Sequence, residues 1–591
     1  MNRLWFSTTT HHTNKTSKFS FRKWYKSHPG FHARLTNVLP EPLVLLLYAV
    51  LIGVVAGYGA VGFRKLISLV TDFFFGFGAH ALSSLGRYHV ILFPIIGLLI
   101  VSAFVKRFAP EAKGHGVPEV MAAIAENHSI IRPRVVFVKA IASAITIGSG
   151  NSAGREGPIV QIGSAFGSIL GQYLNLPERT LRLFVACGAG AGIAATFNAP
   201  IGGVMFATEV ILGSFALQNF TAIVISCVVS AAIGRIYLGN HPAFPMPVYH
   251  TGDFKVYWLF IIAGIFAGLF SYVYIKVLYG TEDWFDRRKW PFWLKALFGA
   301  AIIGIIGVWF PQIFGVGYDT VDMALKNHLG LALLITLLIL KLFATSITIA
   351  AGGSGGVFSP GLYMGSMLGG AIGLVFADLF PHMGISPGSV ATITMAGVFA
   401  GSAQAPVTSI MMLFEMTGDY GIILPIMITS VISATVTGTL TKDNIYTLKL
   451  VRRGLNILRK RDPNRMKAIT VGEALAMERL TIPSNVTIEE AWQRFAEKTA
   501  WFAVVRNPQG VVVGSIARAQ VLEALNSQHT NQLVESLLPE TIYQIDESAC
   551  LAEALTIMKQ RNVTYLVVTR ADAPLGVIGS SDIIYAYKDI D

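Results

Sequence analysis

Long runs of apolar residues without a single charge recur along the chain as far as residue 440. A helix needs roughly 17 to 25 such residues to cross a bilayer core of about 30 Å, and each run is long enough. The pattern therefore predicts a bundle of membrane-crossing helices. The runs are Leu43–Phe63, Tyr88–Val105, Leu217–Gly234, Val256–Ile275, Ala296–Tyr318, Leu342–Ala377, Pro387–Phe414 and Tyr420–Leu440.

Several of these runs are too long for one simple helix, and glycine and proline interrupt them. The stretch Leu183–Thr208 is broken in the same way, because a Gly/Ala-rich segment beginning at Cys187 is followed by Asn198 and Pro200. Broken helices are tolerated inside a bilayer only where protein buries their loose backbone or where they line a cavity. We expect more than ten helices, many of them tilted or partial.

The pattern changes after Arg465, where short β-rich runs alternate with amphipathic helical ones. Two hairpin-like units lie in this region, each with two β-rich runs around a short turn. Their regular recurrence predicts a tandem α/β repeat with one module at 465–530 and another at 531–591. The runs and turns are Ala503–Val505, Asn507–Gly510 and Val511–Val513 in the first module, and Tyr565–Val568, Ala571–Pro574 and Gly576–Ile578 in the second.

Composition excludes a soluble protein of this size. Charged residues make up 14% of the 591 positions and hydrophobic residues 53%, whereas a typical soluble domain is about 25% charged. The 58 glycines suit helices that approach one another closely. The three cysteines, Cys187, Cys227 and Cys550, are far apart, so we expect neither a metal site nor a disulfide framework.

The net charge of +12 is unevenly distributed. Residues 1–40 form a basic tail without Asp or Glu, and a second basic stretch from Lys449 to Arg461 ends the predicted membrane domain at 41–464. By the positive-inside rule both flanks face the cytosol, so the chain crosses the membrane an even number of times. No contiguous basic face is present, which argues against nucleic-acid binding.

The membrane domain contains an internal duplication. The segment from Ala199-Pro200 to Glu209 is echoed by the segment from Ala405-Pro406 to Glu415. A second pair, GREGP at 154–158 and GGVFSP at 355–360, has nearly the same separation, and similarly spaced glycines follow both members. Repeated halves with Gly/Pro-broken segments at matching positions point to a transport site at the repeat interface.

Helix ends explain what such a site can bind. Both GREGP and GVFSP place a proline near a helix start, where its missing N–H costs nothing. The free backbone N–H groups and the positive end of the helix dipole then face whatever lies beyond. Two such ends meeting in the membrane would bind an anion without a full positive charge. The alternative is two capped helix starts buried in protein.

Taken together, these motifs resemble those of the CLC family of chloride channels and chloride/proton exchangers, over roughly residues 40–460. The tail resembles a pair of CBS modules, which commonly follow this membrane domain. The resemblance implies an all-α polytopic membrane domain with inverted repeats of broken, tilted helices, followed by a cytosolic α/β tandem CBS domain. The motifs, in the order of the family, are Lys113–Glu119 (KGHGVPE), Gly154–Pro158 (GREGP), Gly356–Pro360 (GVFSP) and a lone Tyr446.

The resemblance also implies a homodimer in which each subunit carries chloride through its own pathway. Glu156 matches the gating glutamate, which competes with chloride until a proton neutralises it; the alternative is a structural pairing with Arg155. Phe358 would contribute its backbone N–H and Tyr446 its hydroxyl, unless Tyr446 is an interfacial tyrosine. The resemblance gives the anion-binding set as His115, Gly116, Arg155, Glu156, Gly157, Val357, Phe358 and Tyr446.

Two departures from the family pattern affect function. His115 stands where the family usually has an anion-contacting serine; it would offer a backbone N–H or a protonated ring, or else point away. The pair Glu209-Val210 stands where exchangers usually carry two glutamates, the second of which relays protons. Valine cannot carry a proton, so we expect passive, channel-like chloride conduction; the alternative is a chloride/proton antiporter that uses another proton route.

Three further expectations complete this interpretation. Lys139 would set a positive field along the pathway or pair with a buried acid, and Glu209 and Glu415 match structural acidic positions at helix ends. No cofactor is required, although an adenine nucleotide is a candidate ligand of the CBS pair. The candidate nucleotide-binding residues are Thr564, Ser581 and Asp582. In the first module Gln520 replaces the acid, so a purely structural dimerisation module is the other interpretation.

We expect a multi-pass protein of a bacterial inner (plasma) membrane whose partners are a second copy of itself, chloride, protons and lipid. Two rival functions are weaker. An intramembrane hydrolase would need Ser359 or Ser149 to act with His115, but no nucleophile motif surrounds either serine. A nucleotide-sensing receptor with an inert membrane anchor would not need duplicated, glycine-broken halves. We therefore expect a transporter and not an enzyme.

Overall fold

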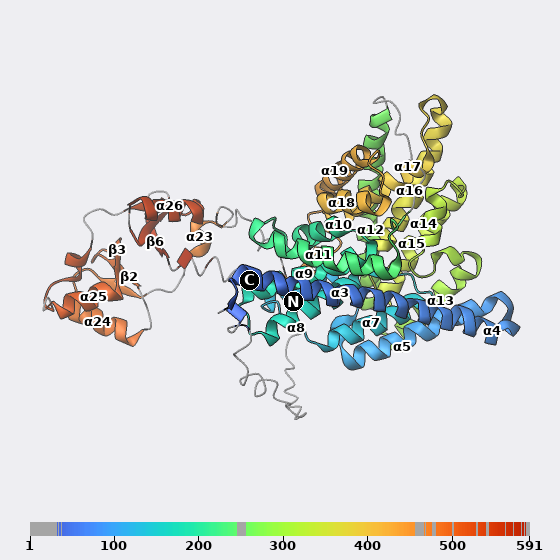
Figure 1. Ribbon diagram of the computed structural model, residues 1–591. Helices are drawn as coiled ribbons and strands as arrows, with labels where there is room; N and C mark the ends of the chain where they lie inside the picture. The colour runs from blue at the N-terminus through green and yellow to red at the C-terminus, as the bar shows by residue number, and fades with distance from the viewer. Residues whose placement is uncertain are drawn as a thin grey trace. The chain divides into compact units, whose positions relative to one another are not determined.

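The computed structural model divides the chain into two compact units, Met1–Leu450 and Val451–Asp591 (Figure 1). Most of the predicted basic tail at 1–40 and part of the basic stretch before Arg465 lie outside the described residues. The structure describes residues 32, 35, 36, 38–244, 256–455, 466, 469–475, 480–498, 502–527, 530–538, 543–561, 563–570, 573–580, 582, 583 and 586.

The first half of the membrane unit consists of helices joined by short turns. In order they are α3 (Glu41–Thr71), the π-helix η1 (Asp72–Gly78), α4 (Ala79–Ala81), η2 (Ser83–Ile91), α5 (Leu92–Phe108), η3 (Pro110–Ala112), α6 (Val117–Glu126), α7 (Arg134–Gly148), α8 (Glu156–Tyr173), α9 (Glu178–Phe197), α10 (Pro200–Met205), the π-helix η4 (Phe206–Leu212) and α11 (Leu217–Leu238).

The second half repeats this kind of succession. Its helices are α12 (Tyr257–Arg287), α13 (Phe292–Trp309), η6 (Pro311–Ile313), α14 (Tyr318–Leu325), α15 (Leu331–Ala350), α16 (Phe358–Leu379), η7 (Pro381–Met383), α17 (Pro387–Ala403), α18 (Pro406–Thr417), α19 (Ile423–Leu440) and α20 (Thr447–Val451). The predicted all-α membrane domain is confirmed.

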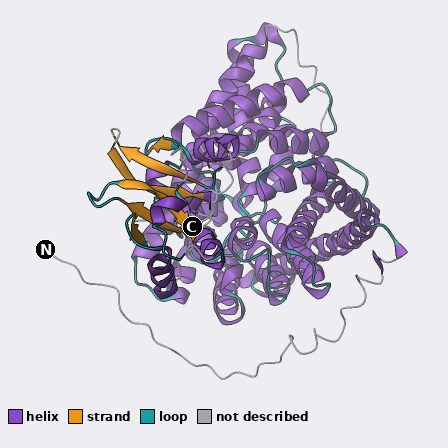
Figure 2. Cartoon of the chain, turned by 90° about the vertical axis from the view of Figure 1, so that its left-hand side faces the viewer, coloured by secondary structure: helices purple, strands orange, loops and turns teal. Residues whose placement is uncertain are grey.

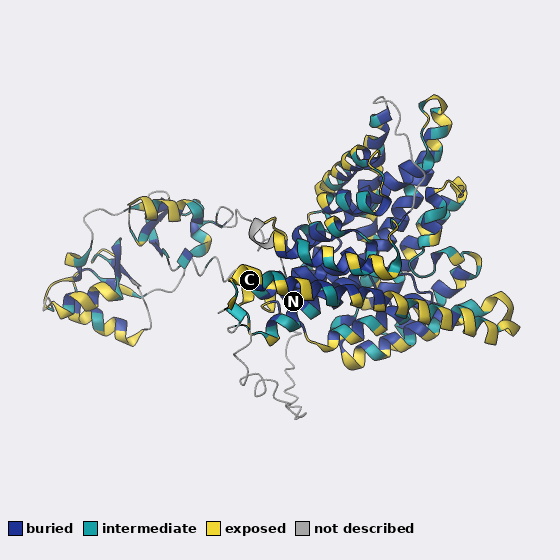
Figure 3. Cartoon of the chain, in the orientation of Figure 1, coloured by how far each residue is buried: buried dark blue, intermediate teal, exposed yellow. Residues whose placement is uncertain are grey.

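Nine helices in the described part of the chain are long and apolar enough to cross a membrane. Apolar side chains are exposed along several of these spans, including Leu69 of α3 and Ile236 of α11. Figure 3 colours the exposed residues along the helices yellow. A surface of this kind suits lipid, which solvates apolar side chains. The spans are Glu41–Ala81, Ser83–Phe108, Glu178–Phe197, Phe220–Leu238, Tyr257–Arg287, Phe292–Trp309, Leu331–Ala350, Phe358–Leu379 and Ile423–Leu440.

The helices break where the sequence predicts. The run Leu342–Ala377 divides between α15 and α16, and Pro387–Phe414 divides between α17 and α18. The stretch Leu183–Thr208 breaks at Asn198, whose left-handed backbone (φ 57°) ends α9. The break between α15 and α16 is buried at residues 353–357, which agrees with the rule that irregular backbone inside a bilayer is covered by protein.

Glycine lets the helices approach closely, as its abundance suggests. The Gly163 of α8 faces the Gly188 of α9, and a Cβ on Gly163 would lie 2.2 Å from the Gly188 carbonyl oxygen. In the reverse direction a Cβ on Gly188 would lie 2.0 Å from the Gly163 oxygen. Any side chain at either position would force α8 and α9 apart.

The duplicated Ala-Pro segments exchange helix caps. Glu209 of the first half accepts hydrogen bonds from the backbone N–H groups of Val407 (3.3 Å) and Thr408 (2.6 Å) at the start of α18. Glu415 of the second half accepts them from Ile201 (3.1 Å) and Gly202 (2.7 Å) at the start of α10. Each carboxylate thus caps the matching helix of the other half, as repeats related by a two-fold axis would do.

Replacement of Glu415 by alanine should destabilise the membrane unit. Two backbone N–H groups at the start of α10 would lose their acceptor, which should lower the free energy of unfolding by about 1–3 kcal/mol. Thermal unfolding of the detergent-solubilised protein measures the effect, and Glu126→Gln at the exposed end of α6 serves as the control. An unfolding midpoint equal to that of the control would contradict the capping role.

The C-terminal unit contains two three-stranded sheets of the same design, drawn in orange in Figure 2. In each sheet the first strand pairs parallel with the second, and the second pairs antiparallel with the third. The predicted hairpins and tandem repeat are confirmed. The elements are α23 (Val471–Ala474), β1 (Thr481–Pro483), α24 (Ile488–Glu497), β2 (Phe502–Arg506), β3 (Val512–Ala517), α25 (Arg518–Asn526), η8 (Val534–Leu537), β4 (Gln544–Asp546), α26 (Leu551–Arg561), β5 (Tyr565–Arg570) and β6 (Ala573–Gly579).

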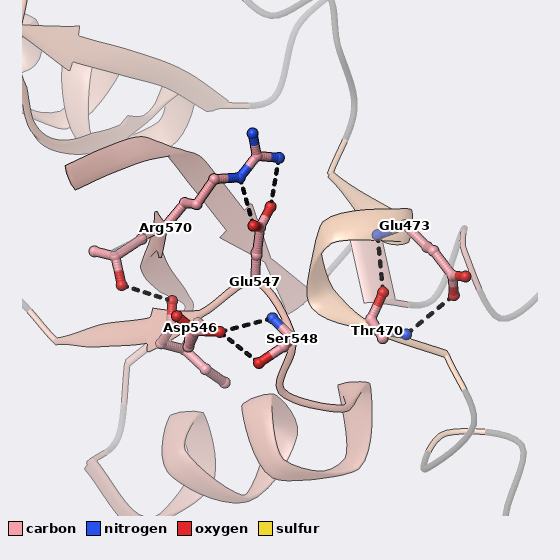
Figure 4. Close-up of polar contacts among 8 residues, drawn as sticks. Thr470, Glu473, Asp546, Glu547, Ser548 and Arg570 are labelled. Carbon is pink, nitrogen blue, oxygen red and sulfur yellow. Dashed lines mark hydrogen bonds and ion pairs between the residues drawn. The ribbon is translucent and has the colours of Figure 1, made fainter. Parts of the chain in front are cut away.

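Polar contacts order the segments around the second sheet, and these include α23, because its Val471 packs in the same core as Ile545 and Leu566 (Figure 4). Thr470 and Glu473 form a capping box at the start of α23, in which each side chain accepts from the backbone N–H of the other residue. The Arg570 guanidinium at the end of β5 makes a two-pronged ion pair with Glu547. Hydrogen bonds from Ser548 lower the pKa of the Asp546 carboxyl.

Candidate functional site

The three sequence motifs meet in the interior of the membrane unit. Gly154 and Gly356 exchange backbone hydrogen bonds of 2.7 and 2.6 Å, which joins the second motif to the third. The Gly114 N–H donates to the Gly353 oxygen (3.1 Å), and the Gly355 N–H donates to the Gly114 oxygen (3.2 Å). Segments far apart in the sequence therefore form one junction, from which α6, α8 and α16 begin.

Glycines allow the first and second motifs to touch. Gly116 has a positive φ of 77°, and a Cβ there would lie 2.6 Å from the Gly157 carbonyl oxygen. A Cβ on Gly157 would lie 1.9 Å from the His115 carbonyl oxygen. No other residue fits at either position without moving the loops, so α6 and α8 start side by side. Convergent helix starts are a recognised arrangement for holding an anion.

Glu156 is the first residue of α8, and 1% of its surface is exposed. Its carboxylate accepts a hydrogen bond from the Ser359 hydroxyl, another from the Ser359 backbone N–H (3.2 Å) and a third from the Tyr318 hydroxyl (3.3 Å). The two hydroxyls also contact each other at 2.6 Å. The buried carboxylate thus sits among donors from α14 and α16.

Arg155 faces aromatic rings. Its guanidinium lies 4.8 Å from the ring centroid of Tyr318 and 5.9 Å from that of Phe197. Among the described residues it forms no ion pair with Glu156, so the structural pairing considered for the two residues is absent there. Arg155 instead lines a cavity of about 220 Å³ together with Arg64 and His241. Three basic side chains in one cavity favour anions.

Tyr446 and His115 are buried next to each other. Their ring centroids are 6.5 Å apart, and 2% and 1% of their surfaces are exposed. The ring of Tyr279 lies near His115 as well, at 6.3 Å, and the Tyr279 hydroxyl donates to the Ile445 carbonyl (2.6 Å), directly before Tyr446. The His115 ring therefore points into the protein, toward Tyr446, and Tyr446 is not at an exposed interfacial position.

The aromatic ring of Phe358 has a packing role. It contacts the rings of Phe399 and Phe197 at centroid distances of 4.3 and 5.3 Å. The carbonyl of the preceding Val357 accepts a hydrogen bond from the Tyr274 hydroxyl (2.9 Å). The ring thus packs against other aromatic side chains, and the backbone N–H of Phe358 is the group that the sequence interpretation offers to an anion.

Lys139 contacts backbone carbonyls. It is fully buried on α7, and its Nζ donates to the carbonyl oxygens of Ala112 (3.0 Å) and Gly114 (2.6 Å) in the loop before α6. The nearby Lys449 lies 3.7 Å from the Glu119 carboxylate. Lys139 thus holds the first motif in place while bringing positive charge close to it.

Val210 is buried within η4, with 5% of its surface exposed. The carboxylate of the adjacent Glu209 faces the start of α18, as described above. The position expected for a proton-relay glutamate is therefore apolar, and its acidic neighbour is occupied as a helix cap.

Sequence reasoning missed Tyr318 and Ser359 as contacts of Glu156. Ser359 lies within GVFSP, next to the residue singled out for the anion site. A signal for Tyr318 also exists, because Gly315-Val-Gly317 before it echoes Gly114-His-Gly116 before α6.

In the tail, Ser581 lies outside the described residues. The Asp582 carboxylate accepts a hydrogen bond from the Gly579 N–H (2.6 Å), and Gln520 of the first module accepts the corresponding bond from the Ala517 N–H (2.8 Å). The backbone carbonyl of Thr564 accepts a hydrogen bond from the Ser580 N–H (3.0 Å). The acid and the amide thus play the same local structural role in the two modules.

Comparison with known proteins identifies the class. Residues 96–438 match the family described as voltage gated chloride channel, and residues 542–589 match the CBS domain. The chain is 32% identical over 411 residues to the H(+)/Cl(−) exchange transporter ClcA of Salmonella arizonae, which covers 67% of this chain and 86% of the relative. The chain belongs to the CLC family and is an integral membrane protein.

Solved structures agree with this assignment. A slow cyanobacterial Cl−/H+ antiporter superposes with a TM-score of 0.65 at 28% identity, over 69% of this chain and 97% of the antiporter. A eukaryotic CLC transporter has a TM-score of 0.63 at 19% identity, over 91% of this chain and 98% of the transporter, which shows a shared fold. The predicted combination of a CLC membrane domain with a CBS tail is confirmed.

Proposed function

We propose that the membrane unit carries chloride across the bilayer along a pathway gated by Glu156. The observation that carries this proposal is the buried carboxylate of Glu156 at the junction from which three helices begin. Backbone N–H groups at helix starts favour an anion, and in the absence of chloride the carboxylate is that anion. The other residues proposed to line the chloride site are His115, Gly116, Arg155, Gly157, Val357, Phe358 and Tyr446.

Gating follows from competition between two anions. The ionised Glu156 carboxylate and chloride both seek the positive ends of α6, α8 and α16. Protonation removes the negative charge, so the helix starts no longer hold the side chain and chloride enters. Flux should therefore rise as the pH falls through the range in which Glu156 takes up its proton.

We further propose that conduction is passive. Val210 has no titratable group, and Glu209 caps α18, so neither offers a relay for protons from the cytosol. Chloride/proton exchange is the second candidate because the Salmonella relative and the cyanobacterial structure are both described as exchangers. Exchange would require protons to reach Glu156 by a path that does not use position 210.

The remaining proposals concern assembly and location. We propose a homodimer of a bacterial inner membrane with both termini in the cytosol, as the basic flanks suggest, and no enzymatic activity. For the tail we propose a structural module first, because the Asp582 and Gln520 side chains act alike as caps. An adenine nucleotide bound near Thr564 and Asp582 is the alternative.

Chloride efflux from liposomes tests the transport function directly. Vesicles loaded with chloride and containing the purified full-length chain should release chloride once a potassium ionophore dissipates the opposing voltage. Protein-free vesicles give the background rate of chloride leakage. Efflux no faster than this leak at every pH from 4 to about 8 would refute the proposal; this range spans the ordinary titration of carboxylates and the shifts that burial produces.

A further inference from the structure

A second buried lysine occupies the counterpart of the Lys139 position. Lys341 lies on α15, is fully buried, and is separated from Lys139 by the same number of residues as Pro360 is from Pro158. Its Nζ donates to the carbonyl oxygens of Ile313 and Gly315, both at 2.9 Å. The two lysines therefore hold equivalent loops in the two halves, before α6 and before α14.

The loop held by Lys341 has little freedom. Gly317 ends it with a positive φ of 82°, and a Cβ there would lie 2.8 Å from the Tyr363 ring and 3.3 Å from the Lys341 Nζ. The same Tyr363 ring faces the Lys341 Nζ at 4.7 Å from its centroid. The Lys341 side chain, the Tyr363 ring and the loop that ends at Gly317 therefore pack against one another.

The residue that follows this loop contacts the gate. Tyr318 begins α14 directly after Gly317, and its hydroxyl lies 3.3 Å from the Glu156 carboxylate and 2.6 Å from the Ser359 hydroxyl. The Phe244 ring packs against Tyr318 at a centroid distance of 5.2 Å. The position of the Tyr318 hydroxyl thus depends on where the loop before it is held.

We propose that Lys341 is a positioning residue for the Glu156 gate and that it acts through Tyr318. By holding the Ile313 and Gly315 carbonyls it fixes the start of α14, so that Tyr318 donates its hydrogen bond to the ionised Glu156. This bond stabilises the closed carboxylate and sets the pH at which the pathway opens. The inference rests on the proposed gating function and extends it to a residue that does not touch the gate.

Other charged and hydroxyl-bearing side chains also lie near the Glu156 carboxylate. Arg155 adjoins it, and the hydroxyls of Tyr274 on α12 and Tyr446 before α20 interact with its charge electrostatically. Ser359 on α16 donates a hydrogen bond but does not titrate in the relevant range. The loop that Lys341 holds also bonds to the segment before the second motif, from the Gly315 N–H to the Gly150 oxygen (3.4 Å). Tyr318 is the residue after this loop that contacts the Glu156 carboxylate itself, and the double-mutant cycle below isolates this route.

The test is a double-mutant cycle on the pH profile of chloride flux. Tyr318→Phe removes only the hydroxyl, and Lys341→Met removes the donors at similar length. Each should shift the half-maximal flux to higher pH, by a factor on the order of three to ten in proton concentration, because a carboxylate that loses a donor binds its proton more readily. Together they should shift it no further than Tyr318→Phe alone.

Two controls separate positioning from a general loss of structure. Lys341→Arg keeps donors for both carbonyls and should retain a midpoint close to that of the wild type. Lys295→Met removes a lysine of the first turn of α13 that pairs with Asp286, and it should leave the midpoint unchanged. If Lys341→Met does not elute as folded protein, Lys341→Gln, which keeps one donating group, replaces it in the cycle.

The outcomes distinguish the inference from the proposed function. An unshifted midpoint in the Lys341 variant, or a shift that adds to that of Tyr318→Phe, overturns the inference while leaving Glu156 as the gate. Absence of flux, or a wild-type pH profile that survives removal of the Glu156 carboxyl, overturns the proposed function itself. A shared, non-additive shift supports both.

Discussion

Replacement of Glu156 by glutamine should remove most of the pH dependence of chloride flux. Glutamine has nearly the same shape as glutamate but carries no charge at any pH, so it does not compete with chloride for the helix starts as a carboxylate does. The variant should conduct at neutral pH about as fast as the wild type conducts when acidified. Chloride efflux from liposomes, measured between pH 4 and about 8, covers the titration range of a carboxylate in this setting.

A matched control tests whether any loss of a carboxylate has this effect. Glu126→Gln makes the same chemical change at an exposed position at the end of α6, and its pH profile should be that of the wild type. Glu156→Ala should behave like Glu156→Gln, since both lack the competing charge. A wild-type pH profile in both Glu156 variants would show that another group gates the pathway.

The second large effect concerns energy coupling. A chloride gradient across vesicles containing the wild-type protein should drive no proton uptake, because the relay position is the buried Val210 and the Glu209 carboxylate is engaged at the start of α18. Chloride should move at a rate set by its own gradient and the voltage alone. The measurement follows external pH and chloride together while the voltage is clamped with a potassium ionophore.

The assay needs a protein that is known to give the opposite result. The Salmonella H(+)/Cl(−) exchange transporter ClcA, 32% identical to this chain, provides that control in vesicles of the same lipid. Protons moving against their own gradient in fixed proportion to chloride would refute passive conduction and favour exchange. In that case Glu156→Gln should abolish the proton movement while chloride still flows.

Much of the fold could be predicted because its signals are local. Length and lack of charge mark the membrane-crossing runs, and the breaks at Asn198 and at the two Ala-Pro segments follow from the backbone preferences of single residues. Alternating β-rich runs around a short turn mark each hairpin of the tail. The short parallel strands β1 and β4 were missed, because three residues carry little pattern and their partners are distant in sequence.

The environment of the gate was predicted less completely. Motifs indicate Glu156, His115 and Tyr446 directly. The motif around Ser359 and the glycine echo before Tyr318 mark helix starts, but neither shows that these two side chains bond to the Glu156 carboxylate. The exchange of caps by Glu209 and Glu415 is likewise invisible along the chain, because each carboxylate bonds to the half of the protein to which it does not belong. Contacts of this kind depend on how the two halves pack.

The sequence by itself determined that this is a duplicated, broken-helix membrane protein with a repeated tail and a glutamate at a helix start. These properties depend on hydrophobicity, on glycine and proline, and on charge, all of which act within a few residues. Only the tertiary structure decided which groups contact that glutamate, because its hydrogen-bond donors on α14 and α16 are more than 160 residues away in the sequence. The hydrogen bonds that stabilise a buried carboxylate are set by packing in three dimensions and not by neighbours in sequence.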